Sequence, residues 1–448
     1  MTSAEAGPLD ATARALPRRR FLTGAGAVAT AAGLGPAILT RRAPAKGETL
    51  TIAQWTHFVP AFDEWFDRKF AKAWGERHGV QVLVDHVSAH DLRARALAEV
   101  AAQRGHDLFG FPTPPAAFEA HVVPLDDVVG ECERRYGKLL RLAHLGTYNP
   151  KSRKYFALAE SWAPNPIHYR ADWWGDVGVK PDSWAEVREG ARRVRERHGA
   201  HAGFGLAREH DSDMVLRGLL WSFGATEQDE GGRVTINSRA TVEALKLMAA
   251  IFKESMTSDV FLWDPSSNNR CFVWGRCSII QNAISAIRTA EKLNPEIAKT
   301  TALAAPASGP QTRLAAVGLL HCYVVWRFGQ NVELAKRFLI DLVAAAEETC
   351  LASELYNFPT FPNAVRDLKG KLAADRASPQ AYPVLADAER WSANPGYPGY
   401  ASAAIDEVLH VSVIPTMFAR VARREQSPED AARQAEAEMK RIFARAAR

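Results

Sequence analysis

The sequence predicts an α/β protein of two lobes joined by hinge crossovers, and three observations support this fold class. Short apolar strands alternate with amphipathic helices, a pattern typical of parallel βαβ units with helices on both faces of a sheet. The chain has 448 residues, which is enough for two domains with a core each. Stiff, proline-containing segments separate groups of strands, as expected where a chain crosses between lobes.

The alternation begins directly after the N-terminal segment. Strands are expected at residues 50–53, 80–84 and 107–111. The helix between the first two strands has an aromatic residue at every fourth position on one face: Phe62, Phe66, Phe70 and Trp74. A second helix, rich in Ala and Leu, is expected at residues 91–104.

The middle of the chain continues the pattern. Further strands are expected at residues 154–159, 277–280 and 323–326, and helices at 184–197, 214–223, 240–254 and 332–351. Ser183 and Glu186 form a capping box for the helix that starts at Trp184. Crossovers between lobes are expected at residues 160–166 and 304–310, with a third at 356–362.

The C-terminal part is expected to be helical over residues 403–411, 415–423 and 429–446. Pro428 in the first turn, followed by two acidic residues, is a strong start for the last helix. These elements predict a first lobe of residues 46–160 plus 306–352. The second lobe is then 161–305 plus 353–448.

Residues 1–45 are expected to be a cleaved export signal. Three arginines, Arg18 to Arg20, precede a mildly apolar run that ends at the small-x-small site Ala43-Pro44-Ala45. Paired arginines before a weakly apolar run resemble the twin-arginine class of signal, which exports folded proteins. The run contains four glycines and a proline, which suits a membrane span poorly, and no cysteine follows it for a lipid anchor. A periplasmic protein without a lipid anchor is therefore expected.

The charge distribution argues against nucleic-acid binding. The chain has 56 basic and 51 acidic side chains, and residues 1–45 hold six of the basic and two of the acidic ones. The rest of the chain is close to neutral, so no basic surface for nucleic acid is expected.

The five cysteines are expected to be mostly small buried apolar residues. An odd number leaves at least one thiol unpaired. Cys271 and Cys277 would meet if the chain turned at Gly275, and the sequence leaves this pairing open.

Four stretches together resemble the family 1 extracellular solute-binding proteins, the sugar receptors of bacterial ABC importers to which maltose-binding protein is related. They are Tyr169-Arg170-Ala171-Asp172 with Gly178 and Pro181–Glu186, Phe272–Ile279, Gln330–Leu339 and Ser427–Ala432. Their order and spacing cover nearly the whole chain after residue 45. The resemblance implies two lobes that close on a ligand and then dock to membrane permease subunits.

The expected ligand is a sugar, oligosaccharide or polyol. Such molecules need flat aromatic surfaces and planar hydrogen-bonding groups, in a pocket beyond the carboxyl ends of the strands. Residues of these types recur at the predicted strand ends and crossovers. The candidate ligand-binding residues are Trp55, His57, Phe58, Thr113, Trp162, Asn165, Asp211, Trp263, Asn269, Asn282, Gly318, His321, Tyr356 and Tyr397.

Several candidates have a structural alternative. Asp211 is favoured as a helix cap over a ligand contact. Trp162 has hinge packing as its alternative, and for Trp263 core packing is weighed equally with ligand contact. Asn282 ranks above Asp211 because it resembles the place of a ligand contact in the family.

Other solutes remain as alternatives to a neutral sugar. A phosphorylated ligand such as a glycerophosphodiester would need arginines in the cleft, and Arg170, Arg208 and Arg270 are the candidates. An amine or polyamine would need acids there, and Asp211 and Asp213 are available.

An enzyme is not expected, because the sequence has no Gly-x-Ser-x-Gly, His-Glu-x-x-His or phosphate-loop motif. The rival hypothesis is a carbohydrate-active enzyme that uses Glu160 and Asp211 as its pair of carboxyl groups. No cofactor and no metal is expected, and the chain is expected to be a monomer.

Overall fold

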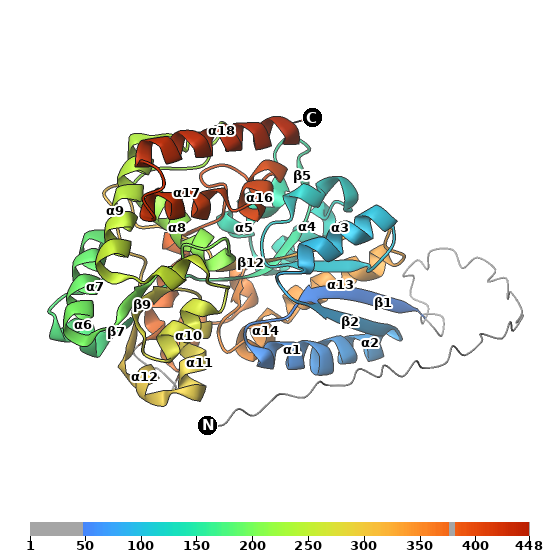
Figure 1. The fold of residues 1–448 in the computed structure, drawn as a ribbon. Coiled ribbons are helices and arrows are strands. Elements are labelled where there is room, and N and C mark those ends of the chain that lie inside the picture. The colour runs from blue at the N-terminus through green and yellow to red at the C-terminus, as the bar shows by residue number, and fades with distance from the viewer. Residues whose placement is uncertain (1–47, 376–380, 448) are drawn as a thin grey trace, which may run out of the picture. The chain divides into compact units, whose positions relative to one another are not determined.

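The computed structural model describes residues 48–375 and 381–447 (Figure 1). The expected export signal at residues 1–45 lies outside them. Among the described residues, none of the helices combines the length and apolar character that crossing a bilayer requires.

The larger sheet has six strands in the order β13-β6-β12-β3-β1-β2. Its strands are β1 (Thr49–Trp55), β2 (Gln81–Val87), β3 (Leu108–Phe111), β6 (Leu158–Ala163), β12 (Leu319–Val325) and β13 (Phe358–Pro359). β1 is parallel to both β2 and β3, as the alternation of strand and helix predicts. β12 is antiparallel to β3 and β6, and β13 is antiparallel to β6, so this first sheet is mixed.

The second sheet has four strands in the order β10-β7-β9-β8. They are β7 (Ile167–Arg170), β8 (His201–Gly203), β9 (Cys277–Gln281) and β10 (Thr301–Ala304). β7 is antiparallel to β9 and β10, whereas β8 is parallel to β9. Two small ladders complete the strands: β4 (Tyr148–Asn149) with β5 (Lys154–Tyr155), and β11 (Ala315–Ala316) with β14 (Ser392–Ala393).

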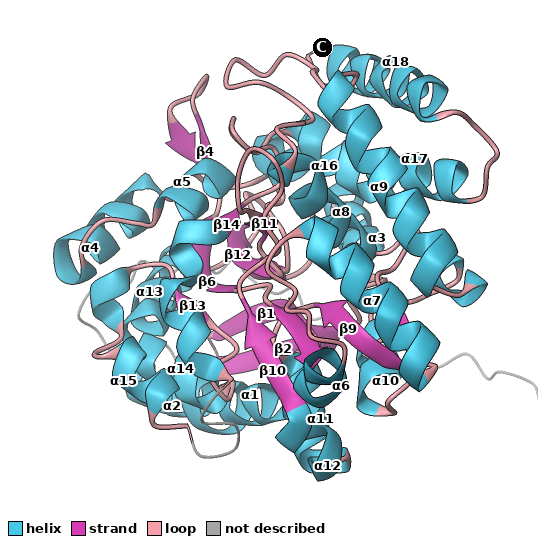
Figure 2. Cartoon of the chain, turned by 90° about the vertical axis from the view of Figure 1, so that its left-hand side faces the viewer, coloured by secondary structure: helices cyan, strands magenta, loops and turns pink. Residues whose placement is uncertain are grey.

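Helices surround both sheets (Figure 2). The first part of the chain forms α1 (Pro60–Trp65), α2 (Lys72–His78), α3 (Leu92–Ala102), α4 (Asp126–Tyr136) and α5 (Arg141–Thr147). The second sheet is accompanied by α6 (Ala171–Asp176), α7 (Trp184–His198), α8 (His210–Ser222), α9 (Arg239–Ser255), α10 (Ser267–Val273), α11 (Ser285–Leu293) and α12 (Pro295–Thr300).

The chain then returns to the first sheet before its final helices. Against the first sheet lie α13 (Val332–Ala344) and α14 (Ala346–Ala352), followed by α15 (Leu368–Ala373). The last helices are α16 (Ala403–His410), α17 (Val413–Ala422) and α18 (Pro428–Ala446), and the last two pack against α9 (Figure 1).

Each sheet has its own hydrophobic core. In the first core the predicted aromatic face is confirmed, since Phe62, Phe66, Phe70 and Trp74 are all buried. A π-helical turn at Phe66–Ala71 joins α1 to α2, so the aromatic residues lie on one continuous helical segment. The Trp74 indole N–H donates to Asp341 of α13 at 2.8 Å, which satisfies its one polar atom.

The second core is built around α7, α8, α9 and the C-terminal helices. α7 begins with the predicted capping box, in which the Ser183 hydroxyl accepts from the Glu186 backbone N–H and the Glu186 carboxylate accepts from the Ser183 N–H. Gly190 lies on this helix against Trp174, where an added Cβ would lie 2.2 Å from the indole ring. The close approach of helix and indole therefore requires glycine.

Some elements differ from the sequence-based expectation. The residues expected as the first crossover, 160–163, continue β6, because both faces of this strand are buried. β12 begins at Leu319, so His321 lies within the strand and not before it. Residues 356–362 do not leave the first sheet, since Phe358 and Pro359 form β13 beside β6.

The residues after 353 divide between the two cores. Tyr356, Phe361, Tyr382 and Trp391 belong to the first core, whereas the helices from α16 onwards belong to the second. The expected division assigned the whole of 353–448 to the second lobe. These aromatic residues are buried in the first core, which the local sequence does not indicate.

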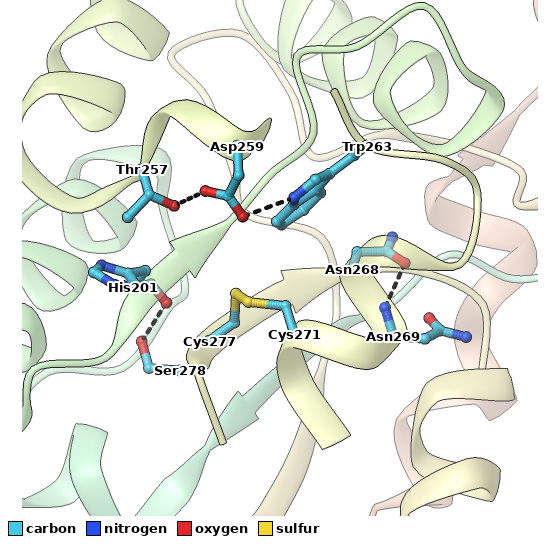
Figure 3. Close-up of a disulfide and its surroundings, with 9 residues drawn as sticks. All are labelled: His201, Thr257, Asp259, Trp263, Asn268, Asn269, Cys271, Cys277 and Ser278. Carbon is cyan, nitrogen blue, oxygen red and sulfur yellow. Dashed lines mark hydrogen bonds between the residues drawn. A yellow bond between two sulfur atoms is a disulfide. The ribbon is translucent and has the colours of Figure 1, made fainter. Parts of the chain in front are cut away.

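Cys271 and Cys277 form a disulfide between α10 and the first residue of β9 (Figure 3). Gly275 lies between them with φ 69°, a left-handed conformation that glycine adopts at no cost. The other three cysteines, Cys132, Cys322 and Cys350, are buried thiols, as expected for small apolar residues.

Candidate functional site

A pocket of about 380 Å³ is lined by residues of the first sheet and its connections and by residues of the helices α8 and α16 of the second core. One wall comes from the segments after β1 and β3 and from the start of α3. The opposite wall comes from the segment before α8, the first turn of α8 and the end of α16. The carboxyl ends of β1 and β3 open into it, as expected for a ligand site of an α/β sheet.

Trp55, the last residue of β1, forms the aromatic centre of the first wall. Its ring lies 5.0 Å from the His321 ring and 5.1 Å from the Phe58 ring, measured between centroids. Phe111 and Phe118 extend the apolar wall. This wall offers flat aromatic surface to a ligand.

Behind Trp55 lies His57, which is buried and held in one tautomer. The Val59 backbone N–H donates to its Nδ1 at 2.9 Å, so Nε2 carries the proton and donates to Asn357 Oδ1 at 3.0 Å. Burial, which outweighs these hydrogen bonds, lowers the pKa of His57 to about 4. His57 is therefore neutral at pH 7.

Glu160, Ser161 and His321 form a buried chain of hydrogen bonds between β6 and β12. The Ser161 hydroxyl donates to Glu160 Oε2 at 2.6 Å and lies 3.2 Å from His321 Nδ1. Burial raises the pKa of Glu160 to about 7 and lowers that of His321. Glu160 Oε1 and His321 Nε2 are buried and lack hydrogen-bond partners among the described residues, so both atoms are able to bind a further polar group.

A cluster of amides holds Asp211 in the first turn of α8. Asn268 of α10 and Asn282, which follows β9, each donate a side-chain N–H to Asp211 Oδ2, at 3.0 and 3.2 Å. Asn269 donates to Ser285 Oγ at 3.2 Å (Figure 3 shows Asn268 and Asn269 beside the disulfide). Burial, which outweighs these two bonds, raises the pKa of Asp211 to about 7.

The sequence favours Asp211 as the N-terminal cap of α8. In the structure the cap is Glu209. The Glu209 carboxylate accepts from the backbone N–H groups of Asp211 and Ser212 at 2.7 and 2.6 Å. The Asp211 carboxylate is thereby left free of the capping role. Burial, and then the charge of Asp211, raise the pKa of Glu209 to about 7.

Three of the predicted residues line the pocket: Trp55, Phe58 and Thr113. Five others lie in the clusters beside it: His57, Asp211, Asn269, Asn282 and His321. The Gly318 carbonyl accepts from Nε2 of His210, a pocket residue, at 2.5 Å.

The remaining predicted residues pack away from the pocket lining. Trp162 donates its indole N–H to the Pro359 carbonyl at 3.1 Å. Trp263 donates to Asp259 at 3.1 Å (Figure 3). Tyr397 packs on Trp221 with 5.4 Å between ring centroids. Asn165 and Tyr356 are buried, and the Tyr356 ring lies 5.0 Å from that of His57.

Sequence reasoning missed the pocket residues of the β2–α3 connection and of α16. They include His90, Arg93, Asp406 and His410. The β2–α3 connection follows the predicted strand at 80–84, but its residues are not among the candidates. The helix α16 directly follows none of the predicted strands, so the strand-end rule does not reach it. Of the three arginines considered for a charged ligand, Arg208 lines the pocket. Arg170 and Arg270 instead pair with Asp172 and Asp264.

Within the described residues, no group of three or more His, Cys, Asp or Glu side chains is arranged to hold a metal ion. The aromatic, polar and charged side chains that line the pocket offer stacking, hydrogen bonding and charge.

Comparison with known sequences gives a short match. No family model matches the chain. Proteins of Brucella abortus (strain 2308) and Brucella suis biovar 1 (strain 1330), both named as binding proteins, are each 24% identical over 107 residues. The match covers 23% of this chain and 26% of each relative, so it spans about a quarter of their length.

Comparison with solved structures covers nearly the whole chain. Maltose-bound MalE3 of T. maritima is 19% identical with a TM-score of 0.74, and 88% of this chain and 99% of that one are covered. A sugar transporter from Arthrobacter chlorophenolicus A6 with bound laminaribiose has 12% identity, a TM-score of 0.75 and the same coverage. A solute-binding protein of an ABC transporter from Agrobacterium radiobacter K84 in complex with ribitol has 16% identity, a TM-score of 0.70 and again that coverage. The predicted two-lobed fold of periplasmic binding proteins is thus confirmed.

Proposed function

We propose that the chain is the solute-binding protein of an ABC importer and that it binds a sugar, oligosaccharide or polyol. The observation that carries this proposal is the pocket beside Trp55, which is lined by the first sheet and by helices of the second core, in a chain with the fold of sugar-binding receptors. MalE3, the Arthrobacter protein and the Agrobacterium protein have maltose, laminaribiose and ribitol bound.

The residues at the pocket suit a polyhydroxylated ligand. The apolar C–H face of a sugar stacks on the Trp55 indole and on Phe58, and Thr113 bonds a hydroxyl. His321 Nε2 and Asp211 Oδ1 lie in the adjoining clusters and supply further acceptors. Because these groups come from separate elements, a ligand that reaches all of them holds the two lobes together.

Ligand binding then acts by a shift of population. Contacts from both lobes exist only in the closed arrangement, so the ligand stabilises that arrangement. The permease subunits in the inner membrane recognise the closed form, and the chain acts as a monomer. The lobes are residues 46–160 plus 306–352 and 161–305 plus 353–448, apart from the segments after 353 that pack in the first core.

Export completes the proposal. Residues 1–45 act as a twin-arginine signal that carries the folded chain to the periplasm, where it remains without a lipid anchor. A fusion of these residues to a reporter tests this step. Export that stops when Arg18, Arg19 and Arg20 are replaced by lysine supports it, and unchanged export contradicts it.

The experiment that tests the function is a thermal-unfolding screen of the full chain. The compounds are monosaccharides, oligosaccharides, sugar alcohols, glycerophosphodiesters and polyamines. A compound that binds only the folded state raises the unfolding temperature, and the shift grows with the ratio of its concentration to its Kd. We expect a sugar or polyol to give the shift. A shift confined to glycerophosphodiesters, or none with any compound, would overturn the proposal.

The same samples distinguish a protein that only binds oligosaccharides from an enzyme that cleaves them. Oligosaccharides incubated with the chain should be recovered unchanged. Glu160 is bound to Ser161 and Asp211 to two asparagines, which supports structural and binding roles for both carboxyl groups. Release of smaller sugars, lost in Glu160→Gln, would instead establish a carbohydrate-active enzyme.

A further inference from the structure

The pocket is lined by three carboxyl groups (Glu209, Asp213 and Asp406), two guanidinium groups (Arg93 and Arg208) and three imidazole groups (His90, His210 and His410). Arg93 lines it, and two carboxyl groups share this guanidinium. Asp406, a second pocket residue, lies 2.8 Å from Arg93 Nη1, and Glu407 lies 3.1 Å from Nη2. One positive charge therefore faces two negative ones at the end of α16.

At α8, too, two carboxyl groups share one guanidinium group. Arg217 is fully buried and forms ion pairs with both Asp213 and Glu227. Asp213 lines the pocket and is 1% exposed. Arg217 holds Asp213 Oδ1, whereas Oδ2 has no hydrogen-bond partner among the described residues. A buried carboxylate oxygen at the pocket wall is thus available to a ligand.

Two further carboxyl groups carry no counter-charge. Glu209 lines the pocket and accepts hydrogen bonds from its own helix, while Asp211 accepts from two asparagine amides. Neither group forms an ion pair with a basic side chain in the described part of the chain. The remaining guanidinium, of Arg208, is on an exposed residue and donates to the Val411 carbonyl at 3.1 Å.

The opposite wall consists of aromatic rings, so the pocket has rings on one side and carboxyl groups on the other. The faces of Trp and Phe rings attract cations, and buried carboxylates bind them strongly. A neutral polyol gains hydrogen bonds from these carboxyl groups but no attraction between opposite charges. A ligand with a positive charge gains from both walls of the pocket.

We propose, on the basis of the function proposed above, that the ligand is a sugar or polyol that carries a protonated amine. The ammonium group lies between the rings of Trp55 and Phe58 and the carboxyl groups at the start of α8. The hydroxyl groups of the ligand bind the amide and imidazole groups of the adjoining clusters.

Titration calorimetry with matched pairs of compounds tests this proposal. The pairs are sorbitol with 1-amino-1-deoxysorbitol, glucose with glucosamine, and each neutral compound that binds in the wider screen with its amino derivative. We expect the amine to bind at least about tenfold more tightly than its neutral partner. Equal or tighter binding of the neutral partner overturns the inference and leaves the proposed function intact. Absence of binding by any sugar or polyol overturns both.

The variant Asp211→Asn tests the role of charge. Asparagine retains an oxygen that can accept from Asn268 and Asn282, so the amide cluster is kept while the negative charge is removed. We expect the affinity for the amine to fall about tenfold more than the affinity for the neutral partner, which loses a hydrogen-bond acceptor but no ion pair. The control is Asp259→Asn, at a carboxyl group that bonds Trp263 outside the pocket. An equal loss for both compounds in Asp211→Asn, with unchanged thermal stability, overturns the inference.

The pH dependence gives an independent readout. Glu209 and Asp211 have pKa values of about 7, and a bound ammonium group favours their ionised form. Binding of an alkylamine then releases protons, so its affinity should rise between pH 6 and 8. The other titratable or charged groups that line the pocket are His90, Arg93, Arg208, His210, Asp213, Asp406 and His410, and burial lowers the pKa of His410. An affinity that is flat or falls over this range overturns the inference.

Discussion

At the scale of single residues, Trp55 is the side chain on which ligand binding depends most. It is 4% exposed, it ends β1, and three rings contact it. A buried aromatic anchor at the centre of a contact surface contributes far more to affinity than residues at its rim.

We therefore expect Trp55→Ala to weaken ligand binding by at least about tenfold, measured by calorimetry with the compound found in the screen. Trp263→Ala is the matched control, because Trp263 bonds Asp259 away from the pocket. Equal affinity in Trp55→Ala and the wild type would show that the indole does not contact the ligand.

His106 and Glu99 form a second residue-scale feature, a buried pair at the end of α3. His106 Nδ1 lies 2.6 Å from Glu99 Oε1, and Nε2 lies 3.1 Å from Asp85 Oδ2. Burial alone would lower the pKa of His106, but the hydrogen bonds and charges of Glu99 and Asp85 raise it above 6.5. Burial likewise opposes ionisation of Glu99, yet the His106 bonds lower its pKa below 4.5.

This pair predicts a pH dependence of stability. The histidine contributes fully below pH 6.5, and its contribution is lost as pH rises through the raised pKa. The glutamate contributes above pH 4.5, and its contribution is lost as pH falls through the lowered pKa. Stabilisation by the pair is therefore greatest between these two values.

We expect His106→Gln to lower the free energy of unfolding at pH 6 by about 1–3 kcal/mol, because Glu99 is left buried without its partner. The difference from the wild type should shrink at pH 9, as measured by urea unfolding. A difference that is constant over this range would show that the pair stabilises the fold by packing alone.

At the scale of elements, the disulfide ties α10 to β9 next to the amide cluster (Figure 3). Asn268 and Asn269 lie on the same helix as Cys271, and Asn282 directly follows β9. The covalent link therefore holds together the two elements that position Asp211.

We expect the double variant Cys271→Ser with Cys277→Ser to lower the free energy of unfolding by about 2 kcal/mol, the value for a closed loop of this length. Reductant should produce a similar loss in the wild type and none in the double variant, which serves as the control. A wild type whose stability is insensitive to reductant would contradict this role.

The helices and strands that the sequence predicts correctly are those whose signals are local. α7 was located correctly because its signals, Ser183, Glu186 and the helical periodicity, are all local. The start of α8 was placed too late because its cap is Glu209, a residue type that rarely caps helices. The length of β6 was missed because Trp162 and Ala163 join the strand through pairing with β12 and β13, which are distant in sequence.

The pocket residues show the same difference between local signals, which a sequence reveals, and contacts between distant residues, which it does not. Trp55 and Thr113 follow strands, and a local rule suffices to select them. Arg93 and Asp406 meet across 313 residues, and no pattern in either segment indicates the other. Trp162 and Tyr397 have the composition of a sugar site, yet Trp162 bonds a backbone carbonyl and Tyr397 packs on Trp221.

At the scale of the whole molecule, the account rests on one ligand that contacts both the first sheet and helices of the second core. Trp55 belongs to the first sheet. Glu209 caps α8, a helix of the second core, and Asp213 lies in the first turn of that helix. Both sides line the same pocket. A ligand that binds there protects segments that lie more than 150 residues apart along the chain.

Hydrogen–deuterium exchange, with and without the compound identified in the screen, measures this directly. The account predicts slower exchange of the backbone amides in two segments at once, residues 55–59 after β1 and residues 209–213 at the start of α8. In Trp55→Ala, both effects should disappear at the same ligand concentration. Protection confined to one of these segments, or found only elsewhere on the chain, would contradict the claim that the ligand binds between the first sheet and the helices of the second core.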